Sequence, residues 1–443
     1  MAIDSTPAPR PRTPGRQIAR VISRTLALTL LALLVALETV PRISPRAARW
    51  FEPDDRLGDV LRLLERHPER WWRLRAGLAT TFAGASVRTG ELHLRGAPSA
   101  GPPAADRLRV LCLGESLTFG WGVEEDQAYP SVLQDLLGEV PLDGRRAEVI
   151  NGGTPGYSSH QGLAFLREVG LELEPDLVTI PYAVNDLDRL RFFRNDGRPD
   201  SALTPGSALG ARVLNAAATS PTVLLTRRLL AGALKGAAVA RLEARALAAG
   251  DQARVPPDDY EANLRELVGI CRERGIAVVL VVVPLHLPLR AVDDPPLELA
   301  GPLAELAAAG VGTGPSDAEL AQLQDWVDEQ LASALDAALA APAEQARERV
   351  DRARHWDAWR CRLACLGYNR VMRRLAAELG TPCTDVAAAV AAHPDAASLF
   401  RGEHADPIHP SPAGHALFAR AIATTIDGSS STASGADPPP AVP

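Results

Sequence analysis

The sequence predicts an α/β protein, a three-layer α/β/α sandwich built on a parallel sheet and carrying helical insertions. Two observations support this fold class. Between residues 106 and 425, short apolar runs alternate with longer segments whose apolar residues recur at helical spacing. Glycine-rich segments follow several of these runs directly, as they do where a strand turns into a loop. Strands that alternate with helices pair in parallel, and helices then cover both faces of the sheet.

Five strands and five main helices are expected. The strands are predicted at residues 109–114, 147–150, 176–180, 276–283 and 382–386. The helices are predicted at residues 127–137, 158–169, 257–274 and 352–379, with a last one from 412 through 422. Each strand run is short and rich in Val, Leu and Ile, which is typical of strands buried on both faces.

This domain, at residues 106–427, is enlarged by two insertions. They span about 187–255 and about 287–350, and the second is rich in alanine and helical in pattern. Residues 428–443 are small, polar and proline-rich, which predicts a disordered tail.

The N-terminal segment has the pattern of a targeting signal. Residues 1–20 are basic, and residues 21–40 contain an uncharged apolar run. A basic start followed by an apolar core is typical of a secretory signal or a short membrane anchor. No small-residue cleavage site follows closely, which favours an uncleaved, single-pass anchor in the cell membrane; cleavage would give a secreted protein. The positive-inside rule places the following domain outside the cytoplasm. An amphipathic or buried helix is the alternative.

Residues 41–105 are predicted to connect the anchor to the domain. Apolar residues from 57 to 75 recur at helical spacing, with Trp71 and Trp72 near the end. Two short strands are expected between 82 and 94, and residues 96–103 form a Gly/Pro-rich linker. The paired tryptophans indicate core packing or a membrane-interface position more than a ligand surface.

Composition limits the possible partners. Hydrophobic residues are 46% and charged residues 23% of the 443, which excludes a wholly disordered chain and a multi-span membrane protein. The formal net charge of -7 argues against a nucleic-acid partner, which needs a basic face. Five cysteines are too few for a disulfide scaffold. Cys361, Cys365 and Cys383 could pair, but packing is the favoured interpretation.

A serine follows the first strand directly. Gly114-Glu115-Ser116-Leu117-Thr118 places Ser116 at the carboxyl end of a parallel strand, where open α/β sheets bind their ligands. The segment matches neither phosphate-binding glycine motif nor the G-x-S-x-G elbow of α/β-hydrolases. Taken alone, it fits a structural turn as well as a nucleophile.

The segment from His404 to His415 carries a candidate base. A serine hydroxyl needs a base to take its proton, and a histidine base needs a carboxylate to orient it. Asp406 and His409 can meet within one turn of chain. The three histidines and one aspartate of this segment could also suggest a metal site, but their spacing matches no zinc pattern.

Two further segments at strand ends offer hydrogen-bond donors. Residues 150–159 follow the second strand and contain Gly156, whose backbone N–H can face an anion. Residues 181–186 follow the third strand and contain Asn185, whose amide can do the same. Acyl transfer needs such donors, because negative charge develops on the carbonyl oxygen. Asp186 and Asp188 could form a metal pair, although capping of a helix start explains them better.

Four segments in this order resemble the SGNH hydrolases, also called the GDSL esterase/lipase family. The resemblance covers about residues 106–425 and implies a flavodoxin-like sandwich. It implies a catalytic triad of Ser116, Asp406 and His409, and an oxyanion hole formed by the N–H groups of Ser116 and Gly156 and the amide of Asn185. It implies neither a metal nor an organic cofactor.

The resemblance has two departures. Glu115 stands where the family usually has aspartate, and Ala183 stands where it usually has glycine. The front of the chain, including Phe51-Glu52-Pro53-Asp54, is similar to that of membrane-anchored bacterial members.

The expected function is ester hydrolysis through an acyl-enzyme. The resemblance implies a small-molecule, glycan or lipid ester as substrate, with O-acetyl groups on carbohydrate favoured. The membrane is an expected partner through the N-terminal segment. One alternative is an O-acyltransferase that uses the same triad to acylate a sugar. The other is a non-catalytic, membrane-tethered binding protein on this fold.

Overall fold

A computed structural model describes most of the chain. The described residues are 14–44, 60, 62–96, 98, 103–138, 144–188, 192–193, 197–233, 237–248, 253–287, 289, 292, 295–309, 315–402, 406 and 408–433. The chain divides into two compact units. One comprises residues 1–58 and 213–234, and the other comprises residues 59–212 and 235–443. Each unit is described on its own.

The larger unit is built on a five-stranded parallel sheet. In spatial order the strands are β6 (Arg146–Gly153), β5 (Arg107–Gly114), β7 (Leu177–Ile180), β8 (Ala277–Val282) and β9 (Cys383–Asp385). All neighbours pair in parallel. In chain order this arrangement is 2-1-3-4-5, the order of flavodoxin-like folds. The predicted fold class and all five predicted strands are confirmed.

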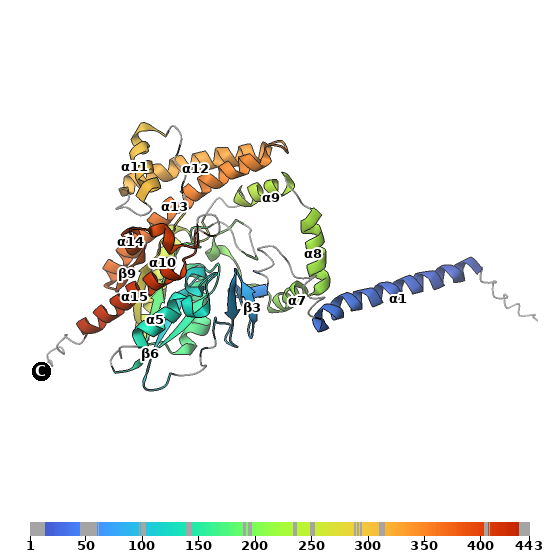
Figure 1. Cartoon of the computed structure of the whole chain (residues 1–443), viewed down its shortest axis with the longest axis horizontal. Coiled ribbons are helices and arrows are strands. Elements are labelled where there is room, and N and C mark those ends of the chain that lie inside the picture. Colours follow the sequence, from blue (N-terminus) through green and yellow to red (C-terminus); the bar gives the residue numbers. More distant parts are fainter. Residues whose placement is uncertain are drawn as a thin grey trace, which may run out of the picture. The chain divides into compact units, whose positions relative to one another are not determined.

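Helices cover the two faces of this sheet (Figure 1). After β5 comes α5 (Tyr129–Gly138), which packs against α15 (Pro412–Ala433). On the opposite face, α10 (Pro257–Glu273) contacts both α6 (Ser159–Phe165) and α13 (Ala346–Leu379). Right-handed crossovers distribute the helices in this way. The predicted helices are confirmed, with α13 beginning six residues before its expected start.

The sequence of α10 illustrates why these segments form helices. Pro257 lies at its first turn, where a missing N–H costs nothing. Tyr260, Leu264, Leu267 and Cys271 recur every three or four residues and are completely buried. The helix therefore buries one apolar stripe against the sheet.

Residues 60–96 differ from the prediction. Of the segment expected to be helical, residues 60, 62 and 63 are helical, but the part from residue 64 to 74 forms an antiparallel hairpin of β1 (Leu64–His67) and β2 (Trp71–Leu74). A second hairpin pairs β3 (Ala79–Phe82) with β4 (Ala85–Arg88). The helical prediction was wrong because Pro68 interrupts the segment and the strands are only four residues long, too short to show alternation.

These two hairpins belong to the main core. Leu64, Trp72, Leu74 and Phe82 lie in the same hydrophobic cluster as the central strands. We call residues 60 and 62–96 the N-terminal module. It belongs to the same compact unit as the sheet.

The insertions are helical, as their composition predicts. The first contains α7 (Ala208–Ala218), α8 (Pro221–Ala233) and α9 (Ala237–Ala248), and the second contains α11 (Leu297–Ala309) and α12 (Asp317–Ala340). The helix α12 packs along α13 around a hydrophobic cluster of its own.

Shorter elements complete the fold. They are α4 (Ser116–Phe119), α14 (Val386–Ala391), the π-turn η2 (Leu166–Gly170), and the 3-10 turns η1 (Glu125–Gln127), η3 (Leu171–Leu173), η4 (Asp200–Ala202) and η5 (Ala396–Leu399). The helix α15 continues to Ala433, into the segment for which a disordered tail is predicted. Residues 434–443 lie outside the described part.

The smaller unit contains α1 (Pro14–Ile43), a helix of 30 residues. Within the described residues, Ile22–Ile43 is the one helical stretch long and apolar enough to cross a membrane, and 6% of its most apolar window is buried. The length and composition of this stretch fit either a membrane anchor or a signal sequence. Near the end of α1, Glu38 accepts hydrogen bonds from the Ser220 hydroxyl and the Thr222 backbone N–H at the start of α8.

Candidate active site

Ser116 lies at a sharp turn between a strand and a helix. β5 ends at Gly114, and Ser116 is the first residue of α4. Gly114 has φ +145°, and a Cβ atom there would lie 2.0 Å from the Thr118 hydroxyl oxygen. That hydroxyl donates to the Leu113 carbonyl at 3.0 Å. The turn thus requires glycine, and it presents Ser116 at the carboxyl edge of the sheet.

The structure brings Ser116, His409 and Asp406 together. Ser116 Oγ lies 2.9 Å from His409 Nε2. His409 Nδ1 lies 2.8 Å from Asp406 Oδ1 and 2.9 Å from Asp406 Oδ2. When Asp406 is ionised, Nδ1 must carry the hydrogen and Nε2 is left to accept from the Ser116 hydroxyl. This is the tautomer that a histidine needs to act as a base toward serine.

Several groups keep Asp406 ionised. It is 7% exposed, and burial opposes its negative charge. Hydrogen bonds from His409 and the charge of Arg401 outweigh that effect, so the pKa of Asp406 lies below its ordinary value. Arg401 Nη1 lies 3.4 Å from Asp406 Oδ2, and Arg401 Nη2 donates to the Ala83 carbonyl at 3.0 Å.

The ring of His409 is packed against Trp121, a contact that sequence reasoning missed. The two rings stack with centroids 4.8 Å apart and planes 7° apart. Trp121 in turn meets the edge of Phe82, with centroids 4.6 Å apart. Both partners of Trp121 are distant in the chain: Phe82 belongs to the N-terminal module and His409 lies near the C-terminus. No local pattern around Trp121 could therefore have indicated these two contacts.

The loop after β6 carries Gly156, the second predicted donor. Gly156 has φ +79°, and a Cβ there would lie 2.4 Å from the Phe192 ring, so only glycine fits. The N–H groups of Gly156 and Ser116 have no acceptor within the described residues. Asn151 at the end of β6 supports the loop, since its side chain accepts from the Gly153 N–H at 3.0 Å.

Asn185 lies behind the serine turn and donates its amide to Glu115. An amide has two hydrogens, so one remains for another acceptor. Glu115 is completely buried, and burial together with the nearby charge of Asp186 raises the pKa of Glu115 well above its ordinary value. Its second oxygen has no partner within the described residues. The buried Glu115 carboxyl thus contacts the side chain of the predicted donor Asn185.

Asp186 is also completely buried, but it binds the start of another helix. It accepts from the Ser159 N–H at 2.8 Å and from the Ser159 hydroxyl, at the first residue of α6. Burial raises the pKa of Asp186 to about 7, against the opposing effect of these hydrogen bonds. Among the residues that the structure describes, no group of three His, Cys, Asp or Glu side chains could hold a metal. His404 lies outside them.

The N-terminal module supports the serine turn as well as the histidine. Arg95 is 3% exposed and donates to the carbonyls of Phe119, Gly120 and Val123 at 2.6, 2.6 and 2.7 Å. These carbonyls form the loop that follows Ser116. The sequence of this region predicts only a connection, and nothing in its local pattern indicates these contacts.

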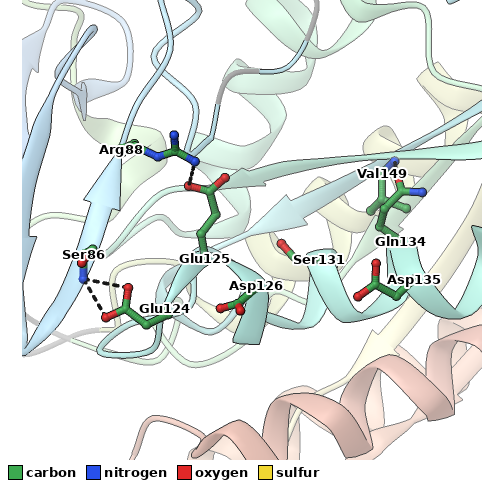
Figure 2. A pocket seen from close by; sticks show the side chains of 9 residues that line it. All are labelled: Ser86, Arg88, Glu124, Glu125, Asp126, Ser131, Gln134, Asp135 and Val149. Atoms are coloured by element: carbon green, nitrogen blue, oxygen red, sulfur yellow. Dashed lines mark hydrogen bonds and ion pairs between the residues drawn. The ribbon is translucent and has the colours of Figure 1, made fainter.

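A cavity of about 480 Å³ lies elsewhere, between the module and α5 (Figure 2). It is lined by Ser86, Arg88, Glu124, Glu125, Asp126, Ser131, Gln134, Asp135 and Val149. Figure 2 shows that Glu125 pairs with Arg88, at 3.5 Å, and that Glu124 accepts from the Ser86 N–H at 3.1 Å. Two of its carboxylates thus hold β4 against η1, and none of Ser116, Asp406 and His409 lines it.

No disulfide joins the cysteines among the residues that the structure describes. Cys112, Cys271 and Cys365 are buried. Burial of the Cys365 thiol has the largest effect on its pKa, which is raised to about 12. A thiol in that state is unreactive, which agrees with a packing role.

The chain is similar to several known proteins. An arylesterase from Vibrio mimicus is 38% identical over 88 residues, which cover 20% of this chain and 42% of that protein. The chain thus spans less than half the length of this curated relative. A lipase/acylhydrolase structure from Enterococcus faecalis has 14% identity and a TM-score of 0.34, covering 73% of this chain and 96% of its own. A variant of an acetyl xylan esterase from Geobacillus stearothermophilus has 16% identity and a TM-score of 0.34, covering 72% and 94%.

The family assignment rests on a longer match. The sequence pattern of the GDSL-like lipase/acylhydrolase family matches residues 112–362, more than half of the chain. This segment begins in β5 and includes Ser116, Gly156 and Asn185. The chain therefore belongs to the GDSL-like lipase/acylhydrolase family.

Proposed function

We propose that the protein is a serine esterase that hydrolyses carboxylic esters through an acyl-enzyme. The observation that carries this proposal is the continuous hydrogen-bonded path from Ser116 Oγ through the His409 ring to Asp406. A hydroxyl, an imidazole and a buried carboxylate in this sequence are the requirements for an activated serine nucleophile.

In the first half of the reaction, Ser116 Oγ attacks the ester carbonyl carbon while His409 Nε2 takes the hydroxyl proton. The carbonyl oxygen becomes an oxyanion. As the tetrahedral intermediate collapses, the bond to the leaving alcohol breaks and His409 returns the proton to it. Asp406 holds Nδ1 and stabilises the positive imidazolium. Water then attacks the acyl-enzyme by the same route, and the carboxylic acid and free Ser116 are released.

Three donors are proposed to stabilise the oxyanion. They are the N–H groups of Ser116 and Gly156 and the second amide hydrogen of Asn185. Within the described part of the chain these hydrogens have no other acceptor, which supports this role, since a donor already satisfied would have to break a bond first. Removal of one such donor typically lowers turnover by about 10²–10³.

The test uses the full chain in detergent. We would measure p-nitrophenyl acetate hydrolysis and fluorophosphonate labelling for the wild type, Ser116→Ala and Ser207→Ala. Ser207 is an exposed serine before α7, so its variant should match the wild type. Loss of both signals in Ser116→Ala alone supports the proposal. Activity that survives in Ser116→Ala would refute it.

The natural substrate is proposed to be an ester outside the cytoplasm, with O-acetyl groups on carbohydrate preferred over lipid esters. The apolar α1 supports a membrane anchor that would hold the domain near envelope polymers. A series of p-nitrophenyl esters tests the acyl length: a maximum at acetate supports the proposal, and a maximum at long chains favours lipid. An acceptor sugar that becomes acetylated would instead reveal the acyltransferase alternative.

A further inference from the structure

We propose that Trp72, in the N-terminal module, is a positioning residue for the oxyanion site. Its indole N–H would hold the peptide group that carries the N–H of Gly156 in the orientation that faces the ester oxygen. This inference rests on the proposed function. It gives a role to one of the two tryptophans for which core packing or a membrane-interface position was predicted.

The central contact is a buried hydrogen bond. Trp72 Nε1 donates to the Pro155 carbonyl at 2.9 Å, and Trp72 is completely buried. The Pro155 carbonyl and the Gly156 N–H belong to one planar trans peptide group, so they point in opposite directions. Holding the carbonyl toward the module therefore directs the N–H away from it.

The turn that contains this peptide has two possible forms. Tyr157 donates its N–H to the Thr154 carbonyl at 3.1 Å, which closes a four-residue β-turn. Pro155 stands at its second position, and Gly156, with φ +79°, stands at its third. That is the pattern of a type II turn. Types I and II differ chiefly by a flip of the central peptide, and proline at the second position suits both.

The indole bond selects between these two forms. A flip to type I would turn the Pro155 carbonyl away from Trp72 and leave a buried indole N–H without an acceptor, which is unfavourable. The same flip would reverse the Gly156 N–H. A donor on the carbonyl also polarises the peptide and strengthens its N–H as a donor. Trp72 thus affects both the direction and the strength of the proposed oxyanion donor.

Neighbouring groups keep Trp72 and the turn in place. Tyr157 donates its hydroxyl to the Trp72 carbonyl at 2.7 Å. Arg254 is 2% exposed, donates to the Gly156 carbonyl at 2.8 Å and lies 5.5 Å over the Trp72 ring. Arg254 is itself held by Asp200, at 3.2 Å. The carbonyls of Pro155 and Gly156 are therefore each bound by a buried side chain from outside the turn.

The backbone before Trp72 is strained. Trp71 has φ +62°, a left-handed conformation that bulky residues rarely adopt. Its ring stacks on His160, with centroids 5.7 Å apart and planes 5° apart. Such strain persists only where surrounding contacts determine it. The two indoles lie 6.4 Å apart, centroid to centroid, with their planes tilted by 48°. The Trp71 ring packs on His160 of α6, and the Trp72 ring reaches Pro155.

The test compares Trp72→Phe with Trp359→Phe in the full chain. Both tryptophans are completely buried, but Trp359 lies in the separate α12–α13 cluster. For each we would measure kcat and KM with p-nitrophenyl acetate, the inhibition constant of a trifluoromethyl ketone, and the melting temperature. The ketone forms a tetrahedral oxyanion on a serine nucleophile, so its affinity reports on the oxyanion donors.

For Trp72→Phe we expect kcat to fall about tenfold with KM nearly unchanged, and ketone affinity to fall by a similar factor, because the lost interaction acts on the transition state. Trp359→Phe should change neither. An unchanged kcat or ketone affinity in a folded Trp72→Phe would overturn the inference, and so would equal losses in both variants. If Trp72→Phe does not fold, Tyr157→Phe keeps the indole but removes its anchor, and it should show the same pattern more weakly.

This outcome is separable from the proposed function. A Ser116→Ala variant that keeps activity refutes the esterase mechanism itself. An inactive Ser116→Ala beside a fully active Trp72→Phe refutes only the role of Trp72.

Discussion

The tautomer of His409 can be tested by replacing Asp406 with asparagine. In the structure, Asp406 faces donors on both sides. Oδ1 accepts from the His409 backbone N–H at 3.3 Å and lies 2.8 Å from Nδ1, while Oδ2 lies 2.9 Å from Nδ1 and 3.4 Å from Arg401 Nη1. Asparagine has one acceptor oxygen and one donor NH₂ group, so it cannot satisfy both sides.

Arg401 decides how the asparagine would turn. If the amide NH₂ faced the guanidinium, two donors would oppose each other. On the other side the NH₂ group would face the His409 backbone N–H, which is a neutral donor, whereas the guanidinium carries a full positive charge. The oxygen should therefore face Arg401, and the NH₂ group should face His409 Nδ1. That arrangement makes Nδ1 an acceptor and places the ring hydrogen on Nε2, where it can no longer accept from Ser116. In trypsin-like proteases the same change lowers kcat by about 10⁴, which corresponds to about 5 kcal/mol. We expect a loss of 10³–10⁴ here.

The assay is kcat/KM for p-nitrophenyl acetate between pH 6 and 9, with the rate of fluorophosphonate labelling as a second readout. The double variant Asp406→Asn/Arg401→Met removes the opposing donor, so the amide can turn over and we expect about tenfold recovery. Asp395→Asn, at an exposed helix cap, serves as the control. Asp406→Asn with more than a tenth of wild-type activity would refute the tautomer argument. Losses that simply add in the double variant would refute the role given to Arg401.

Two further predictions concern other buried contacts. Trp121→Leu removes the ring stacked on His409. Since an aromatic pair contributes about 0.5–1.5 kcal/mol, kcat should fall about tenfold in a folded protein. Trp326→Leu on α12 is the control, and equal losses of kcat in the two variants would contradict the prediction. Asp186 has a pKa raised to about 7 from an ordinary 3.8, so ionising it opposes folding. The free energy of unfolding should therefore fall by up to about 4 kcal/mol as pH rises from 3.8 through 7. Chemical denaturation at pH 4 and pH 8 should show that Asp186→Asn abolishes this fall. The same pH dependence in the wild type and the variant would count against the prediction.

The sheet and its helices were predictable because their signals are local. The apolar strand runs and the repeat of Tyr260, Leu264 and Leu267 in α10 reflect the burial that each element needs by itself. The spacing of Asp406 and His409 is equally local, since three residues of chain suffice to join carboxylate and imidazole. Their approach to Ser116 was expected from the resemblance to the SGNH hydrolases, because no local pattern joins residues so distant in the chain.

The N-terminal module could not be predicted in the same way. Its strands of four residues are stabilised by pairing and by the main core rather than by their own pattern. Apolar residues in so short a segment fit a helix as well as a hairpin. The wrong prediction for residues 57–75 follows from that ambiguity.

The sequence by itself thus determined the parallel α/β fold and the residue types available for chemistry at the sheet edge. Only the tertiary structure decided how those residues are supported. Trp72 reaches Pro155 across 83 residues, and Phe82 reaches Trp121 beside His409. Glu115 meets Asn185 across 70 residues. Contacts between residues so distant in the chain depend on how separate elements pack, and the periodicity of a single segment carries no information about its neighbours.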